Sequence, residues 1–86
     1  MYVIVVYDVE ADRTRKFLKY LRRYLTHVQN SVFEGELTEG DYETVKTDLQ
    51  TMLKAGESVM IYRMSSEKYV DRSVFGHDPM DDQQFL

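Results

Sequence analysis

The sequence predicts an α+β fold whose elements follow the order strand, helix, strand, strand, helix, strand. Three observations support this prediction. Residues 2–7 form an unbroken apolar run, and two segments, about 12–25 and 38–54, repeat apolar side chains at helical spacing. Residues 28–37 and 58–64 are rich in the β-branched and aromatic side chains that favour strands. The chain has 86 residues, which leaves room for one domain.

The first strand, residues 2–7, has no polar residue, which is typical of a central strand that is buried on both faces. Asp8 ends this strand. Asp12 is a candidate N-cap for a helix that continues to about Leu25. The apolar side chains of this helix fall on one face, and they are Phe17, Leu18, Leu21, Tyr24 and Leu25.

Residues 28–37 are predicted to form two strands, because the apolar residues at the two ends of this segment have opposite parity. A change of parity indicates a tight turn or a bulge, which we expect near Asn30-Ser31. Gly35 lies inside the second of these strands and predicts a close approach of another backbone or a kink.

The second helix is predicted to begin at Thr38. Asp41 follows three residues later, which resembles a capping box with Asp in place of Glu. Apolar side chains recur at helical spacing until Ala55-Gly56 ends the helix. The strand at 58–64 then completes the order.

This order is the ferredoxin-like split βαβ plan, in which two helices cover one face of a four-stranded antiparallel sheet. A short extended segment around 72–76 predicts an extra fifth strand, so residues 1–76 form the ferredoxin-like domain. Residues 77–86 contain acidic side chains and no basic one, and we expect a flexible tail. Because both parities of the first and fourth strands are apolar, a second copy of the protein is the simplest cover for the open face.

The basic residues are concentrated in one segment of an acidic chain. The net charge of −4 argues against a nucleic-acid binder. Residues 11–25, however, have a net charge of +5, which leaves −9 elsewhere. The candidate nucleic-acid contacts are Arg13, Arg15, Lys16, Lys19, Arg22 and Arg23. Alternatively, each of these is a solvated residue on a helix face.

Asp8 is the sharpest candidate for chemistry, because a carboxylate directly after an apolar strand is held rigidly. If a second copy brought another Asp8 close, the two like charges would require a cation. Mg²⁺, or Mn²⁺ in its place, accepts one or two carboxylates and several waters, and it would polarise a phosphodiester and activate water. Alternatively, Asp8 starts a turn or caps the following helix. His27 and His77 have no neighbour at metal-ligand spacing, so zinc is not expected.

No cysteine is present, so no disulfide framework is expected. The apolar run at residues 1–7 is too short for a signal peptide or a membrane span. We therefore expect a cytoplasmic protein that does not contact the membrane.

Three segments together resemble a known family. They are Tyr7-Asp8-Val9, Gln29-Asn30-Ser31-Val32-Phe33-Glu34-Gly35 and Ser73-Val74-Phe75-Gly76. With these segments at these spacings, the chain resembles the small CRISPR-associated adaptation proteins of the Cas2 family over residues 1 to about 76.

The resemblance implies a homodimer in which the C-terminal strand, here around Val74-Phe75, crosses to the partner's sheet. It implies a role in acquiring CRISPR spacers, in which the dimer bridges two dimers of the CRISPR integrase and helps to hold a duplex of foreign DNA. Members of the family have also been described as metal-dependent endonucleases on RNA or duplex DNA, with the residue at the position of Asp8 as metal ligand. Tyr7, Ser31 and Phe33 match further motif positions, whereas His27 stands where the family has a basic residue.

Three functions are therefore open: an adaptation scaffold, a Mg²⁺-dependent endonuclease that uses Asp8, and a ligand-binding regulatory module. The regulatory module is the least favoured, because the junction from Asp8 to Asp12 lacks the glycine that such modules carry. Phe33 either stacks on a base or packs in the core. The tail after Gly76 is either a docking segment for the integrase or disordered.

Overall fold

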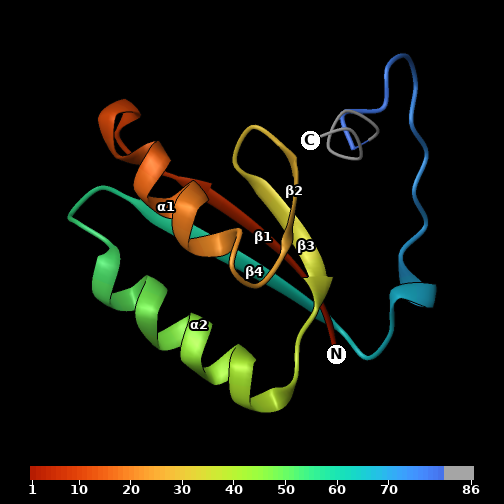
Figure 1. Ribbon diagram of the computed structural model, residues 1–86, viewed down its shortest axis with the longest axis horizontal. Coiled ribbons are helices and arrows are strands. Elements are labelled where there is room, and N and C mark those ends of the chain that lie inside the picture. The colour runs from red at the N-terminus through yellow and green to blue at the C-terminus, as the bar shows by residue number, and fades with distance from the viewer. Residues whose placement is uncertain (81–86) are drawn as a thin grey trace.

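The computed structural model describes residues 1–80, which form a four-stranded antiparallel sheet in the order β2-β3-β1-β4 with two helices on one face (Figure 1). This is the predicted ferredoxin-like arrangement. The elements are β1 (Tyr2–Asp8), α1 (Thr14–Leu21), β2 (Thr26–Gln29), β3 (Val32–Glu36), α2 (Glu39–Met52) and β4 (Ser58–Met64). Two short 3₁₀ turns lie at Ala11–Arg13 and Glu67–Tyr69.

The core lies between the sheet and the two helices. β1 is a central strand, and its alternate residues Val3, Val5 and Tyr7 point to the helices and are buried. The helices and β3 complete the core with Phe17, Leu21, Phe33, Val45 and Leu49. The apolar character of both faces of β1 is therefore explained on this side by helix packing.

The turn predicted near Asn30-Ser31 is confirmed. Asn30 adopts a positive φ of 43°, and the register of β2 against β3 shifts between His27 and Gln29, which is a bulge. Gly35 has a close neighbour, but it is a side chain and not the predicted backbone. A Cβ atom at this position would lie 3.2 Å from Cδ2 of Leu25, whereas the nearest backbone atom, Cα of Leu25, would be 3.8 Å away.

The predicted start of the second helix is also confirmed. Thr38 is the N-cap of α2, and its Oγ1 accepts a hydrogen bond of 3.1 Å from the backbone N–H of Asp41. The hydrogen-bonded strand β4 has the predicted bounds, Ser58–Met64.

The prediction of one helix from Asp12 to about Leu25 is wrong at both ends. Asp12 lies in a 3₁₀ turn, and α1 begins at Thr14 without a side-chain cap. At the other end α1 stops at Leu21, and a tight turn brings the N–H of Leu25 to the carbonyl of Leu21 at 2.9 Å. This turn places Leu25 in the core against Gly35, and that contact rather than helix propensity sets the end of α1.

Residues 70–80 contain no strand within the single chain. Arg72 forms an ion pair with Glu34 of β3, whereas Phe75 is 92% exposed. The predicted fifth strand is thus not formed on the chain's own sheet, and its crossing to a partner stays a prediction. Most of the predicted acidic tail, residues 81–86, lies outside the described residues.

The face of the sheet that the helices leave open carries exposed apolar side chains. Met60 and Tyr62 of β4 are 52% and 53% exposed, and they pair across the strands with Val6 and Ile4 of β1. Within residues 1–80, no helix is long and apolar enough to cross a membrane.

Candidate nucleic-acid interface

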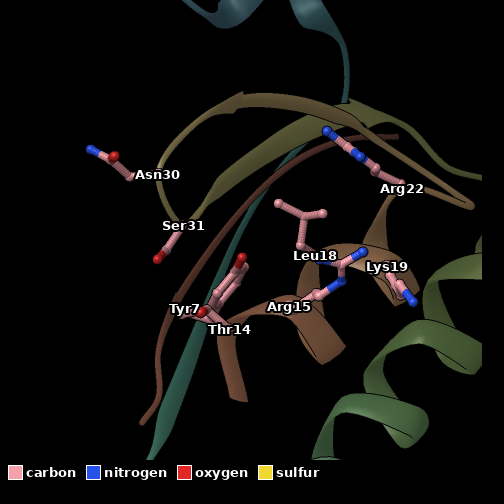
Figure 2. Close-up of a pocket in the computed structure, with 8 residues that line it drawn as sticks. All are labelled: Tyr7, Thr14, Arg15, Leu18, Lys19, Arg22, Asn30 and Ser31. Carbon is pink, nitrogen blue, oxygen red and sulfur yellow. The ribbon is translucent and has the colours of Figure 1, made fainter. Parts of the chain in front are cut away.

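A hollow of about 640 Å³ lies between α1 and the turn that joins β2 to β3 (Figure 2). Its lining is dominated by cations and hydroxyl groups. The lining residues are Tyr7, Thr14, Arg15, Leu18, Lys19, Arg22, Asn30 and Ser31. Five of the sequence-predicted site residues therefore meet here, and they are Tyr7, Arg15, Lys19, Arg22 and Ser31.

The spacing of the three cations explains why they share one surface. Arg15, Lys19 and Arg22 stand at positions i, i+4 and i+7, which lie on one side of an α-helix. Phe17 and Leu21 of the same helix point to the core and are fully buried. Anchoring of the apolar side of α1 thus holds the basic side over the β2–β3 turn.

The three cations of the hollow are not neutralised by any residue that the structure describes. Arg15, Lys19 and Arg22 form no ion pair with any of residues 1–80. Their positive charge is consequently available to an anion, and phosphate oxygens are the natural acceptors for such a set of donors.

Tyr7 supplies a rigid hydroxyl to the hollow. Its ring stacks on Phe17 and Phe33 at centroid distances of 5.5 and 6.2 Å. Burial raises the pKa of the Tyr7 hydroxyl, against the lowering effects of a hydrogen bond with Ser31 and of the charge of Arg22. The hydroxyl therefore stays protonated at neutral pH and acts as a hydrogen-bonding group rather than as a base.

Lys16 and Arg23 lie outside the hollow. The guanidinium of Arg23 lies over the rings of Tyr20 and Tyr24, 5.5 and 5.7 Å from their centroids. Lys16 is exposed. Only three of the six predicted basic residues therefore line the hollow, and the other three lie elsewhere.

Arg13 is the clearest departure from the predicted nucleic-acid contacts. Its Nε and Nη2 bind the two carboxylate oxygens of Glu57 at 2.7 and 3.0 Å, and Nη2 also donates to the Met52 carbonyl at 2.6 Å. The side chain of Arg13 is only 13% exposed. Its guanidinium is committed to the interior of the domain instead of to phosphate.

Asp8 is exposed at the end of β1 and pairs with Ser58 of β4. Successive side chains of a strand alternate between faces, so Asp8 belongs to the open face with Val6, whereas Tyr7 belongs to the helix face. Asp8 accordingly does not line the hollow. Among residues 1–80, no group of three or more His, Cys, Asp or Glu side chains could hold a metal ion.

Phe33 and His27 are structural in this chain. Phe33 is fully buried and stacks on the His27 ring at 4.7 Å, which agrees with core packing rather than base stacking. Nε2 of His27 lies 2.7 Å from the Asn30 carbonyl oxygen, an acceptor, so this nitrogen carries the proton and holds the turn.

Sequence reasoning missed four residues of this region. Thr14 and Asn30 line the hollow, but Thr and Asn have no pattern that marks them as ligands. Glu57 and Glu34 are nearly buried carboxylates, with exposures of 2% and 4%. A signal was available for Glu34, because an acidic residue in the middle of a strand needs a cation when it is buried.

The two helices have opposite charge. α1 carries the basic residues, whereas α2 carries four acidic residues and one lysine, namely Glu39, Asp41, Glu43, Lys46 and Asp48. The hydroxyl of Tyr20 donates to Asp48 at 2.5 Å, and burial together with this bond raises the pKa of Tyr20. The helices therefore present one basic and one acidic surface on the same side of the sheet.

Comparison with known proteins agrees with this architecture. Residues 1–72 match the family described as CRISPR associated protein Cas2. A CRISPR-associated endoribonuclease Cas2 of Archaeoglobus fulgidus is 48% identical over 77 residues, covering 88% of this chain and 84% of the relative. A CRISPR-associated endoribonuclease Cas2 of Dictyoglomus turgidum is 41% identical and covers 100% of both chains.

Solved structures give the same result. A crystal structure of Cas2 superposes with a TM-score of 0.83 at 42% identity, over 91% of this chain and 88% of that chain. Streptococcus pyogenes Cas2 superposes with a TM-score of 0.72 at 28% identity, over 86% of this chain and 100% of that one. The family match over residues 1–72 and the 41% and 48% identity of these relatives show that the chain belongs to the Cas2 family of CRISPR-associated proteins.

Proposed function

We propose that this chain is a CRISPR adaptation protein that binds foreign DNA as a homodimer and bridges dimers of the CRISPR integrase in the cytoplasm. The observation that carries the DNA-binding part is the hollow, in which three cations surround hydroxyl and amide groups and form no ion pair with residues 1–80. Such a set binds the phosphate backbone without reading the sequence, as a protein that handles foreign DNA requires.

A comparison of two double variants of α1 tests the hollow. Arg15→Gln with Lys19→Gln removes two charges from the hollow, whereas Lys16→Gln with Arg23→Gln removes the same charge from outside it. We expect the first variant to lose duplex affinity and to lower the slope of log K against log salt concentration by about 2 for each hollow that contacts the duplex. The second variant should stay close to wild type.

Fluorescence anisotropy with a labelled duplex at several salt concentrations measures both quantities. Equal losses in the two variants would mean that α1 attracts DNA through its total charge, and the hollow would lose its assigned role. Circular dichroism of each variant checks that the fold is retained.

The bridging role depends on the open face of the sheet and on the integrase. The exposed Met60 and Tyr62 make this face suitable for a second copy, which would produce a twofold platform with two hollows. Purified protein, the integrase of the same locus and a short duplex should form a complex of one dimer with two integrase dimers. Absence of the complex at low and at moderate salt would refute the bridging role.

A second function is favoured by Asp8. The relatives from Archaeoglobus fulgidus and Dictyoglomus turgidum are named endoribonucleases. Asp8 is an exposed carboxylate at a rigid strand end, on the face that a second copy would cover. We therefore propose a metal-dependent endonuclease on RNA or duplex DNA as the alternative activity.

One chain supplies one of the two carboxylates that such a metal site would need. A carboxylate oxygen is a ligand that Mg²⁺ and Mn²⁺ accept, and Asp8 of each copy would supply one across the twofold axis. When bound, the cation supplies charge that polarises a phosphodiester and activates water. Asp8 would hold the cation, and the cations of α1 would hold the phosphate backbone.

Replacement of Asp8 by Asn tests this activity, because Asn has nearly the same shape and no charge. Wild type should cleave single-stranded RNA or duplex DNA in Mg²⁺ or Mn²⁺, and Asp8→Asn should lose the cleavage while it keeps duplex affinity. Lack of cleavage by wild type on both substrates with either metal would refute the endonuclease and leave the scaffold. Spacer acquisition that survives Asp8→Ala in cells would make the scaffold the main function.

A further inference from the structure

The most completely bonded side chain outside the hollow is the carboxylate of Glu57. Its Oε1 accepts from Arg13 Nη2 at 3.0 Å and from the N–H of Lys54 at 2.9 Å. Its Oε2 accepts from Arg13 Nε at 2.7 Å and from the N–H of Glu10 at 3.2 Å. Four donors thus fill the acceptor capacity of one carboxylate.

These bonds converge from parts of the chain that are distant in sequence. Glu10 belongs to the loop after β1, and Arg13 ends the 3₁₀ turn that follows. Lys54 and the Met52 carbonyl, which also accepts from Arg13, lie at the end of α2. Glu57 directly precedes β4, so its carboxylate joins the exit of β1 to the end of α2 and the start of β4.

The exit of β1 is the place where Asp8 stands. Asp8 is the last residue of β1 and pairs with Ser58, the neighbour of Glu57. Only Val9 separates Asp8 from the Glu10 amide that Glu57 holds. β-pairing thus fixes the backbone on one side of Asp8, and the Glu57 carboxylate fixes it on the other.

We propose that Glu57, held in place by Arg13, is a positioning residue that fixes the loop after β1 and thereby the direction of the Asp8 carboxylate. This inference rests on the endonuclease alternative proposed above as far as catalysis is concerned. Its structural part concerns Asp8 alone and does not depend on cleavage.

Burial supports a positioning role for the pair over contact with substrate. The side chains of Arg13 and Glu57 are 13% and 2% exposed. The guanidinium of Arg13 also lies 5.6 Å from the centroid of the buried Phe17 ring. Nη1 is the one nitrogen of this guanidinium with no bond to residues 1–80, which is too little for a bidentate phosphate contact.

The test compares Glu57→Gln with Glu43→Gln, its matched control. Glu43 forms an exposed ion pair with Lys46 on α2, so both variants lose one carboxylate from an ion pair and only one alters the exit of β1. Without metal or substrate, NMR should show a shifted Asp8 carboxyl resonance in Glu57→Gln. Amide exchange at Glu10 should rise about tenfold, because a hydrogen bond to a charged group is lost.

With substrate, Glu57→Gln and Arg13→Gln should each lower kcat by at least about tenfold while KM stays within about twofold, which is the pattern of a displaced catalytic group. The double variant should be no worse than either single variant, because both break the same contact. Because partial unfolding would also lower the apparent kcat without changing KM, the kcat of each variant is referred to its folded fraction, measured by circular dichroism.

Several outcomes would overturn the proposal. One is an Asp8 resonance and Glu10 exchange in Glu57→Gln that match Glu43→Gln. Another is a rise in KM for Arg13→Gln with no change for Glu57→Gln, which would return Arg13 to the phosphate contacts. If wild type does not cleave any substrate, the endonuclease fails separately, and the Asp8 resonance still decides whether Glu57 positions this carboxylate.

Discussion

Arg13 and Arg15 are two residues apart in the sequence, but their guanidinium groups lie in different environments. The guanidinium of Arg13 is enclosed by Glu57 and the Met52 carbonyl, whereas Arg15 lines the hollow and forms no ion pair in the described part of the chain. The difference follows from position, because Arg13 precedes α1 and faces the end of α2, while Arg15 lies on the basic side of α1. Local sequence composition alone does not separate the two roles.

At the residue scale, we predict that the stabilisation from Glu57 depends on pH. The hydrogen bonds from Arg13 lower the pKa of Glu57 from 4.5 to about 2. Because the folded pKa lies below the unfolded value, the stabilisation is fully present above about pH 4.5 and is lost as the pH falls toward 2. Wild type should therefore be more stable than Glu57→Gln at neutral pH, and the difference should shrink through this range.

Urea denaturation at several pH values between 7 and 2 measures this difference. Glu43→Gln serves as the control, because its exposed ion pair contributes little at any pH. If the difference in the free energy of unfolding between wild type and Glu57→Gln stays constant down to about pH 2, the prediction is contradicted.

At the scale of elements, the two helices show what local sequence decides. The start of α2 was predictable, because the Thr38 hydroxyl and the Asp41 amide form the cap within one turn. The end of α1 was not predictable, because it is set by the packing of Leu25 against Gly35, ten residues further along the chain. The β2–β3 turn was predictable since a change of parity has few backbone solutions.

The cap of α2 gives a prediction at this scale. Thr38→Ala should lower the free energy of unfolding by about 1 kcal/mol, because the Asp41 amide loses its acceptor. Thr44→Ala is the control, since Thr44 is exposed in the middle of α2 and alanine has the higher helix propensity. Chemical denaturation should rank the proteins Thr44→Ala, wild type, Thr38→Ala from most to least stable, and equal effects would show that the cap contributes nothing.

At the scale of the whole molecule, the open face of the sheet is the apolar surface that a single chain leaves uncovered. Met60 and Tyr62 are half exposed there, and the carboxylate of Glu34 is held by Arg72 from the segment that follows β4. The sequence predicted that this face needs a cover, because both parities of β1 and β4 are apolar. The ion pairs Arg72–Glu34 and Arg13–Glu57 were not predicted, because a charged residue in a sequence does not indicate which residue about 40 positions away will pair with it.

We predict that Met60→Lys produces a monomer. The substitution places a charge in the centre of the apolar face, where a second copy would have to desolvate it. Sedimentation velocity should show a dimer for wild type and a monomer for Met60→Lys. Thr51→Lys, on the exposed surface of α2, should remain dimeric. A wild type that sediments as a monomer at micromolar concentration would contradict the dimer itself.

The separation of charge between α1 and α2 has a consequence for the proposed binding of DNA. The described fold extends over 34 × 29 × 22 Å, and electrostatic screening acts over about 30 Å at 0.01 M salt but about 8 Å at physiological ionic strength. In dilute salt a phosphate backbone therefore senses the whole acidic protein, whereas in the cell it senses only the nearest face. Physiological screening lets a protein of net charge −4 approach DNA with α1 in front, and it makes orientation rather than overall charge the selective step.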